Sequence, residues 1–309
     1  MSKLEIKIDS TVLGRSGCIL NLHNSCVEGY VVRALGASMV YGIAVHKFVD
    51  VMYQTGGMYP IAIKAALELF ERLPKTLEFK SEWLCDPLHM RTTCHRLWTT
   101  YIEEEKNFEV LFLGNKPATE QTFNFIYYED DDLIVRLCGT IDSIGQFKGG
   151  CFAIRDWKTT SFWDKKKYMK QYELSRQLRI YTLACKLMTQ REPESTLGKI
   201  GATKMGAFID AVFLKKEANE VEFVRSDVHQ YSDEELSAFQ LTLDDQCRKL
   251  SVAIKTGYIP KEGIVNGSCI TPYGLCDFWN VCKSSKNVGE VLLARDFKKR
   301  EFNPLEYNV

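Results

Sequence analysis

Two short segments of the sequence place acidic and basic side chains at spacings that suit metal-assisted chemistry. The first is residues 139–142, GTID, and the second, after a turn that contains glycine, is residues 154–158, IRDWK. Residues two apart on a strand share a face, so Asp156 and Lys158 are predicted to point into one site. Asp142, near the end of the preceding strand, can supply a second carboxylate beside Asp156.

Two carboxylates at one site favour a hard divalent cation. Mg²⁺ and Mn²⁺ take oxygen ligands, keep several waters and complete their shell with substrate phosphate. Such a cation can position and deprotonate a water while polarising a scissile phosphate, and Lys158 would stabilise the charge that develops there. A D-x-K tripeptide is often only a solvated strand face. Here it lies among apolar residues, and buried charges need partners.

These segments resemble the active-site hairpin of the PD-(D/E)XK nucleases, in which an acidic residue precedes a D-x-K tripeptide. Gln177 and Tyr181 are similar to the Q-x-x-x-Y pattern of the RecB-like branch, and they lie one helical turn apart on one side. The resemblance implies that both belong to the catalytic site. Without the resemblance, the same pair would be a core tyrosine beside a surface glutamine.

Residues 42–46, GIAVH, resemble the N-terminal G-x-x-x-H helix of that branch. The resemblance implies that His46 joins Asp142 and Asp156 in the metal site. Glu120, just before a predicted strand, matches an acidic position of the family. The plainer alternatives are a core histidine on an apolar helix and a glutamate that happens to open a strand.

Eleven cysteines are an odd count, and without a secretory signal we read clustered cysteines as metal ligands rather than as a disulfide framework. Cys269, Cys276 and Cys282 are so close that a shared ligand is implied. Cys26 resembles the N-terminal cysteine of iron–sulfur members of the RecB-like branch, such as AddB and the CRISPR-associated exonucleases. Four thiolates suit a 4Fe-4S cluster of structural role, zinc is the chief rival, and Cys18 could replace Cys26.

The elements that must position these residues follow from periodicity. Apolar residues at helical spacing predict helices within 18–53, 60–73 and 172–188. Strands are predicted at 122–128, 133–144, 152–157 and 205–214, and the acidic run 129–132 suits a hairpin turn. Ser232 and Glu235 form a capping-box pattern that opens a helix ending near Lys255.

This order of elements predicts an α/β fold with a mixed β-sheet flanked by helices, because a strand–helix–strand passage needs a crossover. The resemblance makes it restriction-endonuclease-like. We expect a single domain over 1–309, with a mainly helical part at 1–115, a catalytic αβ core at 116–215, and a final helix and cysteine-cluster region at 216–309.

Composition limits the partners. Lysine plus arginine and aspartate plus glutamate both number 40, so any DNA-binding surface must be local. No run of about eighteen apolar residues or signal-peptide pattern occurs, which predicts a cytoplasmic protein without a membrane partner. Residues 58–109 match no motif, but they mix basic and aromatic side chains, as a single-strand groove or an ordinary solvated helical face would: Lys80, Arg91, His95, Arg96, Trp98 and Lys106.

The sequence therefore predicts a Mg²⁺- or Mn²⁺-dependent DNA nuclease, an exonuclease acting on single-stranded or end-exposed DNA in recombination, repair or replication. No Walker A sequence is present, so a helicase or recombination protein would be a separate partner. One alternative is a catalytically silent PD-(D/E)XK module that binds DNA or protein and keeps a metal cluster as a staple. Another is a zinc- or iron–sulfur-stabilised interaction protein with a fortuitous D-x-K.

Overall fold

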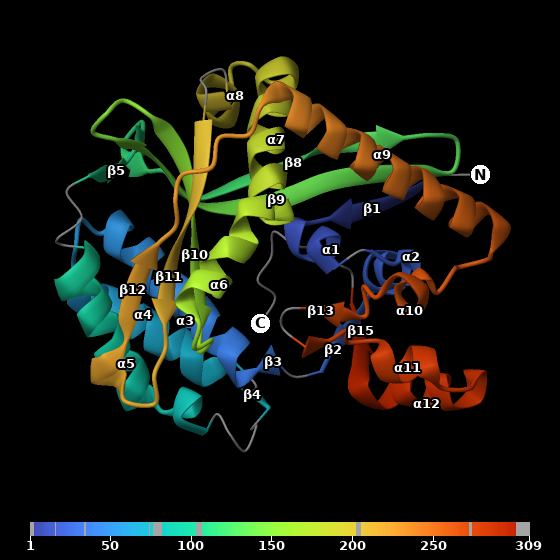
Figure 1. The fold of residues 1–309 in the computed structure, drawn as a ribbon, viewed down its shortest axis with the longest axis horizontal. Coiled ribbons are helices and arrows are strands. Elements are labelled where there is room, and N and C mark those ends of the chain that lie inside the picture. Colours follow the sequence, from blue (N-terminus) through green and yellow to red (C-terminus); the bar gives the residue numbers. More distant parts are fainter. Residues whose placement is uncertain are drawn as a thin grey trace. The chain divides into compact units, whose positions relative to one another are not determined.

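The chain forms two compact units in the computed structural model, which describes residues 3–15, 17–33, 35–73, 75–76, 82–102, 107–201, 205–271 and 274–300. Unit 1 comprises Met1–Arg33, Thr122–Gly139 and Ser232–Asn308. Unit 2 comprises Ala34–Gln121 and Thr140–Tyr231. Figure 1 shows a mixed α/β architecture with helices flanking a central sheet, which confirms the predicted fold class.

The sheet of unit 2 is built around β10 (Phe152–Thr160). This strand runs parallel to β11 (Met205–Phe213) and antiparallel to the end of β9 (Leu133–Phe147). Every residue of β11 is buried, as expected of a strand covered on both faces. Two short strands, β12 (Glu222–Arg225) and β5 (Phe108–Val110), pair antiparallel with β11 and β9.

Three helices of unit 2 share one hydrophobic core: α3 (Ala37–Gln54), α4 (Tyr59–Arg72) and α5 (Pro87–Leu97). Trp157 of β10 and Val212 of β11 belong to the same core, so these helices cover the sheet face to which Trp157 points. α7 (Arg176–Arg191) also packs against β10 and β11. It begins where the Ser175 side chain accepts a hydrogen bond from the Leu178 N–H.

The other described elements of unit 2 are short: β3 (Leu35–Gly36), β4 (Lys75–Thr76), a 3-10 helix (Glu82–Cys85), a π-helix (Trp98–Ile102), β6 (Phe112–Leu113), β7 (Lys116–Pro117), α6 (Lys165–Lys170), a 3-10 helix (Gln171–Leu174), α8 (Thr196–Gly201) and a 3-10 helix (Ala218–Glu220).

Unit 1 contains β1 (Leu4–Ile8), which pairs in parallel with the first residues of β9. Its long helix α9 (Asp233–Thr256) starts with the predicted capping box of Ser232 and Glu235 and stops at Gly257, whose φ is 68°. β8 (Thr119–Glu129) pairs with β9, and both strands contribute residues to each unit. The remaining elements are α1 (Ser10–Arg15), α2 (Ile19–Leu22), a π-helix (His23–Val27), β2 (Tyr30–Val32), α10 (Glu262–Asn266), β13 (Ile270–Thr271), β14 (Gly274–Leu275), α11 (Trp279–Lys283), α12 (Lys286–Asp296) and β15 (Phe297–Lys299).

The helical pattern predicted over 18–53 is interrupted in the structure. Gly29 has a φ of 69°, and a Cβ there would come within 2.1 Å of the Arg300 carbonyl oxygen, so the chain turns out of the helix. β2 then pairs with β15 instead. The chain clusters into two compact units, and the prediction of one domain in three consecutive parts stays a prediction. None of the helices in the described ranges is long and apolar enough to cross a membrane.

Candidate active site

The D-x-K residues lie side by side on β10. The Lys158 Nζ is 2.5 Å from the Asp156 Oδ2, and the Asp156 carboxylate is only 1% exposed while Lys158 is 19% exposed. Within the described part of the chain, the Asp156 Oδ1 has no hydrogen-bond partner. A buried carboxylate oxygen without a donor is costly, so this atom is suited to a cation.

Strand register places Asp142 next to Asp156. The antiparallel β9–β10 ladder ends at the pair of Arg155 and Ser143, whose neighbours in sequence are Asp156 and Asp142, and the two aspartates are close enough for the charge of Asp142 to raise the pKa of Asp156. The Trp157 backbone N–H donates a hydrogen bond of 2.6 Å to the Asp142 Oδ2. This bond holds the Asp142 carboxylate in place, and the sequence did not reveal it because it depends on strand register.

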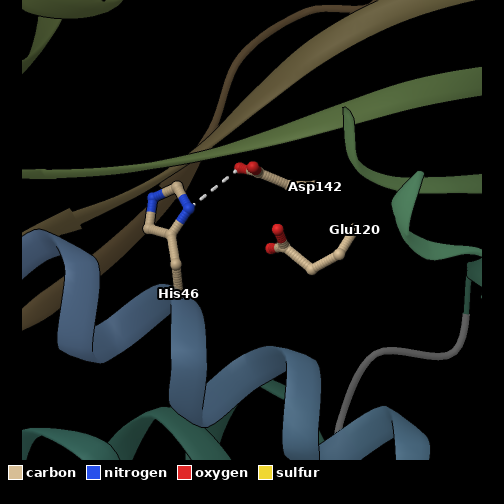
Figure 2. A group of neighbouring side chains, drawn as sticks. All are labelled: His46, Glu120 and Asp142. Atoms are coloured by element: carbon tan, nitrogen blue, oxygen red, sulfur yellow. Dashed lines mark ion pairs between the residues drawn. The ribbon is translucent and has the colours of Figure 1, made fainter. Parts of the chain in front are cut away.

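Asp142 also meets two side chains that are distant in sequence. Figure 2 shows His46 from α3, Glu120 from β8 and Asp142 from β9 converging on one point. The His46 Nδ1 is 3.3 Å from the Asp142 Oδ2, and one ligand atom from each of the three residues lies within 4.8 Å of the others. An imidazole with two carboxylates is a donor set that can hold a divalent cation.

Glu120 is held in an unusual conformation. Its φ of 48° falls in the left-handed region, which residues other than glycine, asparagine and aspartate rarely adopt. The preceding Thr119 donates its hydroxyl to the Asp50 Oδ1 at 2.8 Å, and the Gln54 Nε2 donates to the same oxygen at 2.7 Å. Strain of this kind persists where surrounding contacts enforce it, which is typical of functional sites.

Asp50 is therefore a residue of this site that the sequence interpretation missed. Its carboxylate is buried, and it lies on α3 one turn beyond His46. The i to i+4 spacing of a histidine and an acid on one helix was the available signal.

Burial and mutual repulsion perturb the carboxylates strongly. Burial raises the pKa of Glu120 to about 8, with further increases from Asp142 and Asp50. Burial, opposed by Lys158, raises the pKa of Asp156 to about 6. The pKa of Asp142 is lowered because His46, Lys158 and the Trp157 N–H together outweigh its burial.

His46 responds in the opposite sense to its own burial. Burial lowers the pKa of an imidazole, but Asp142 and Glu120 raise that of His46 to about 9. The site thus gathers negative charge, which Lys158 neutralises in part and which the raised pKa values of Glu120, Asp156 and His46 show to favour bound protons. A divalent cation would take the place of these protons.

Gln177 and Tyr181 contact each other on α7, as their spacing predicted. The Gln177 Nε2 donates a hydrogen bond of 2.8 Å to the Tyr181 Oη. Their helix packs against β10, the strand that carries Asp156 and Lys158. The role of the pair in catalysis stays a prediction.

The C-terminal cysteines lie in unit 1, where Cys18 accompanies them. A Cβ added at Gly263 would meet both the Cys269 Sγ, at 2.8 Å, and the Cys18 Cβ, at 3.2 Å. Burial raises the pKa of Cys282 to about 11, and the thiols of Cys276, Cys18 and Cys269 raise it further.

Cys26 has different neighbours. Burial raises its pKa well above the ordinary value, and the charges that add to this effect are those of Asp9 and Cys138. Among the described residues, His46, Glu120 and Asp142 form the only group of three or more potential ligands whose atoms lie within 4.8 Å of one another, so no three of the described cysteine sulfurs lie that close together.

The basic and aromatic residues of 58–109 are largely engaged in packing. The Trp98 ring stacks on Tyr59 with centroids 4.7 Å apart. Arg96 donates to the backbone carbonyls of Asn219 and Val221. These contacts favour the interpretation as an ordinary helical face. Lys80 and Lys106 lie outside the described residues.

Residues 18–283 match the family described as the PD-(D/E)XK nuclease superfamily. The chain belongs to this family. Its nucleases use divalent metals, which agrees with the donor set around Asp142.

A solved structure named "Crystal structure of SSO0001" is similar at 10% identity, with a TM-score of 0.29, over 79% of this chain and 87% of that one. No curated protein matches the sequence.

Proposed function

We propose that this chain is a Mg²⁺- or Mn²⁺-dependent deoxyribonuclease of the RecB-like branch, an exonuclease that hydrolyses phosphodiester bonds of single-stranded or end-exposed DNA. The observation that carries the proposal is the buried carboxylate–lysine pair of Asp156 and Lys158 beside the group of His46, Glu120 and Asp142. A surface D-x-K without function would not need a buried aspartate next to a second acid.

The residues divide the work by their chemistry. A bound divalent cation would supply an activated water nucleophile and neutralise charge on the scissile phosphate. Asp142, Asp156, Glu120 and His46 would hold it, and the Trp157 N–H fixes the orientation of Asp142. Lys158 retains partial access to solvent, so its ammonium can reach a phosphate and stabilise the developing negative charge.

The decisive experiment compares cleavage of end-labelled single-stranded and duplex DNA with and without Mg²⁺ or Mn²⁺. Asp156→Ala and Lys158→Ala should abolish metal-dependent cleavage while the circular dichroism spectrum is unchanged. Lys64→Ala, at an exposed lysine of α4, is the matched control and should cleave normally. Cleavage by Asp156→Ala at the wild-type rate would refute the assignment of the active site. The ladder of labelled products shows from which end of the strand the enzyme cleaves.

DNA is the proposed partner, in recombination, repair or replication. The sequence has no Walker A motif, so unwinding of a duplex would have to come from a helicase or recombination protein that binds this chain. Co-purification with a helicase that accelerates duplex degradation would support this arrangement.

For the cysteine cluster we propose a structural 4Fe-4S site held by Cys18, Cys269, Cys276 and Cys282, in place of the Cys26 expected from the resemblance. The support is the shared surroundings of Cys18 and Cys269 and the hydrogen bond of 3.2 Å from the Asn21 Nδ2, on the helix after Cys18, to the Cys276 Sγ. A hydrogen bond of 2.6 Å from the Asn266 Nδ2 to the Gly17 carbonyl joins the same two segments.

Metal analysis of anaerobically purified protein tests this ligand set. Cys18→Ser should lower iron content and thermal stability together, because cluster binding is coupled to folding. Cys26→Ser is the matched control and should retain its iron. Loss of iron in Cys26→Ser but not in Cys18→Ser would restore Cys26 as the ligand. A content of one zinc and no iron per chain would show that the site is a structural zinc site and not an iron–sulfur cluster.

A further inference from the structure

An exposed aromatic pair follows directly after the strand that carries the D-x-K residues. β10 ends at Thr160, and Phe162 and Trp163 follow after Ser161, before α6 (Lys165–Lys170) begins. The Trp163 side chain is 80% exposed, and its ring stacks on that of Phe162 with centroids 6.4 Å apart and an angle of 22° between planes. Single exposed hydrophobic residues are ordinary, so exposure alone implies little.

The support beneath Trp163 distinguishes it from an ordinary surface residue. Phe162 lies 6.1 Å from the ring of Tyr168, a buried residue of α6, and Tyr168 contacts Phe213 of β11 edge-on at 5.4 Å. The Phe162 N–H also donates to the Thr160 Oγ1 at 3.1 Å. A series of rings therefore runs from the sheet to the surface and holds the last one, Trp163, with its outer side exposed to solvent.

The helix after Trp163 is basic. It contains Lys165, Lys166, Lys167 and Lys170, and it begins at Asp164, whose side chain accepts from the Lys167 N–H. Lys165 pairs with Glu222, whereas Lys166, Lys167 and Lys170 are exposed and form no ion pair with a described carboxylate. In a chain with equal numbers of acidic and basic residues, this is a local excess of positive charge.

We propose that Phe162, Trp163 and the exposed lysines of α6 form a platform that binds single-stranded DNA next to the carboxylate–lysine site. A base stacks on the exposed side of Trp163, and Lys166 and Lys167 contact backbone phosphates. Stacking on an aromatic ring with phosphate contacts nearby is how proteins bind single strands without sequence preference. A base within a duplex is already stacked and cannot use the ring, so the platform favours single strands.

The distance to the cleavage site fits a nucleic acid strand. Trp163 follows Lys158 by five residues, which span at most about 18 Å even when fully extended. That distance corresponds to at most about five nucleotides at the rise of about 3.4 Å of a strand stacked as in a duplex, and to fewer in a more extended single strand. A strand held at Trp163 can therefore present its scissile phosphate near Lys158. This inference rests on the proposed nuclease function and adds the residues that hold the substrate strand.

The test measures binding separately from cleavage, by fluorescence anisotropy with divalent metals chelated. The probes are a fluorescein-labelled oligothymidylate and an abasic strand of the same length and charge. Trp163→Ala should raise the Kd for oligothymidylate about 5- to 150-fold, the range expected when one base no longer stacks on a ring. Its Kd for the abasic strand should equal that of the wild type, and Trp163→Phe should recover most of the affinity.

The lysines should behave differently from the tryptophan. Lys166→Gln combined with Lys167→Gln should weaken binding of both strands and reduce the salt dependence of Kd, by about 0.7 in the log–log slope for each phosphate that a lysine no longer neutralises. The matched controls are Phe112→Ala, an aromatic that is 69% exposed on β6, and Lys64→Gln on α4. Both controls should bind like the wild type.

The outcomes separate this inference from the proposed function. An unchanged Kd in Trp163→Ala, or an equal weakening on oligothymidylate and abasic strands, overturns the platform even if the wild type cleaves DNA. A wild type that binds as expected but cleaves no DNA with Mg²⁺ or Mn²⁺ leaves the platform standing and refutes the nuclease. If Trp163→Ala lowers the melting temperature, Trp163→Phe and the lysine variants decide the question.

Discussion

Replacing Glu120 by glutamine should make the metal-free protein more stable at alkaline pH and weaken its metal binding. Glu120 lies beside Asp142 and Asp50, and burial with this repulsion raises its pKa from 4.5 to about 8. A carboxyl group whose pKa is raised on folding is held in its protonated form by the native state. Folding stability is then fully present below about pH 4.5 and falls as the pH rises through about 8. Glutamine cannot ionise and avoids this fall.

The size of the effect follows from the same two values. The difference between 4.5 and about 8 corresponds to at most about 5 kcal/mol, at about 1.4 kcal/mol for each pH unit. Glu120 is partly exposed, so solvent screens its charge and we expect about 1–2 kcal/mol. Glu120 lies in unit 2, and for a domain of about 180 residues this energy would make the melting temperature of Glu120→Gln about 2–8 °C higher than that of the wild type.

The assay is thermal unfolding of wild type and Glu120→Gln across this pH range, with chelator and then with Mn²⁺. Without metal, the two melting curves should coincide near about pH 4.5 and separate progressively up to about pH 9. With Mn²⁺ the order should reverse, because the carboxylate is a ligand. Glu68→Gln, at an exposed glutamate of α4, is the matched control and should show neither effect. A constant difference between the curves at every pH would refute the reasoning.

Three further predictions concern the same site. His46→Ala should weaken Mn²⁺ binding in calorimetry by about tenfold or more, and a change in thermal stability alone would make His46 a packing residue. Thr119→Val, which removes the hydroxyl bonded to Asp50, should cost about 1–3 kcal/mol of stability and also lower Mn²⁺ affinity, whereas an effect on stability alone would separate Asp50 from the site. Mn²⁺ affinity should rise between about pH 6 and 9. The reason is that His46 and Glu120, with pKa values of about 9 and about 8, must each release a proton before they can bind the metal. Calorimetry in buffers of different ionisation enthalpy counts the protons released.

Local periodicity allowed the sequence to predict the framework of this site. The alternation of a strand places Asp156 and Lys158 together, and the 2.5 Å contact between them confirms it. One helical turn between Gln177 and Tyr181 predicts in the same way that they face the same side, and a hydrogen bond joins them in the structure. The capping box at Ser232 and Glu235 also formed as predicted. Each of these features depends on neighbours within four residues, whose geometry is set by the backbone.

Contacts between distant segments were decided by the tertiary structure. The strand register sets the bond from the Trp157 N–H to Asp142, and the packing of α3 against the sheet sets the approach of His46. The left-handed conformation of Glu120 has no signal in its own residue type. The resemblance favoured Cys26 as the partner of the C-terminal cysteines, with Cys18 as the alternative, and only the fold places Cys18 beside Cys269. Periodicity predicts which way a side chain faces, but the packing of the core decides which distant residues it contacts. Burial of apolar surface is non-directional, so it allows many pairings of helices and strands until the whole core forms.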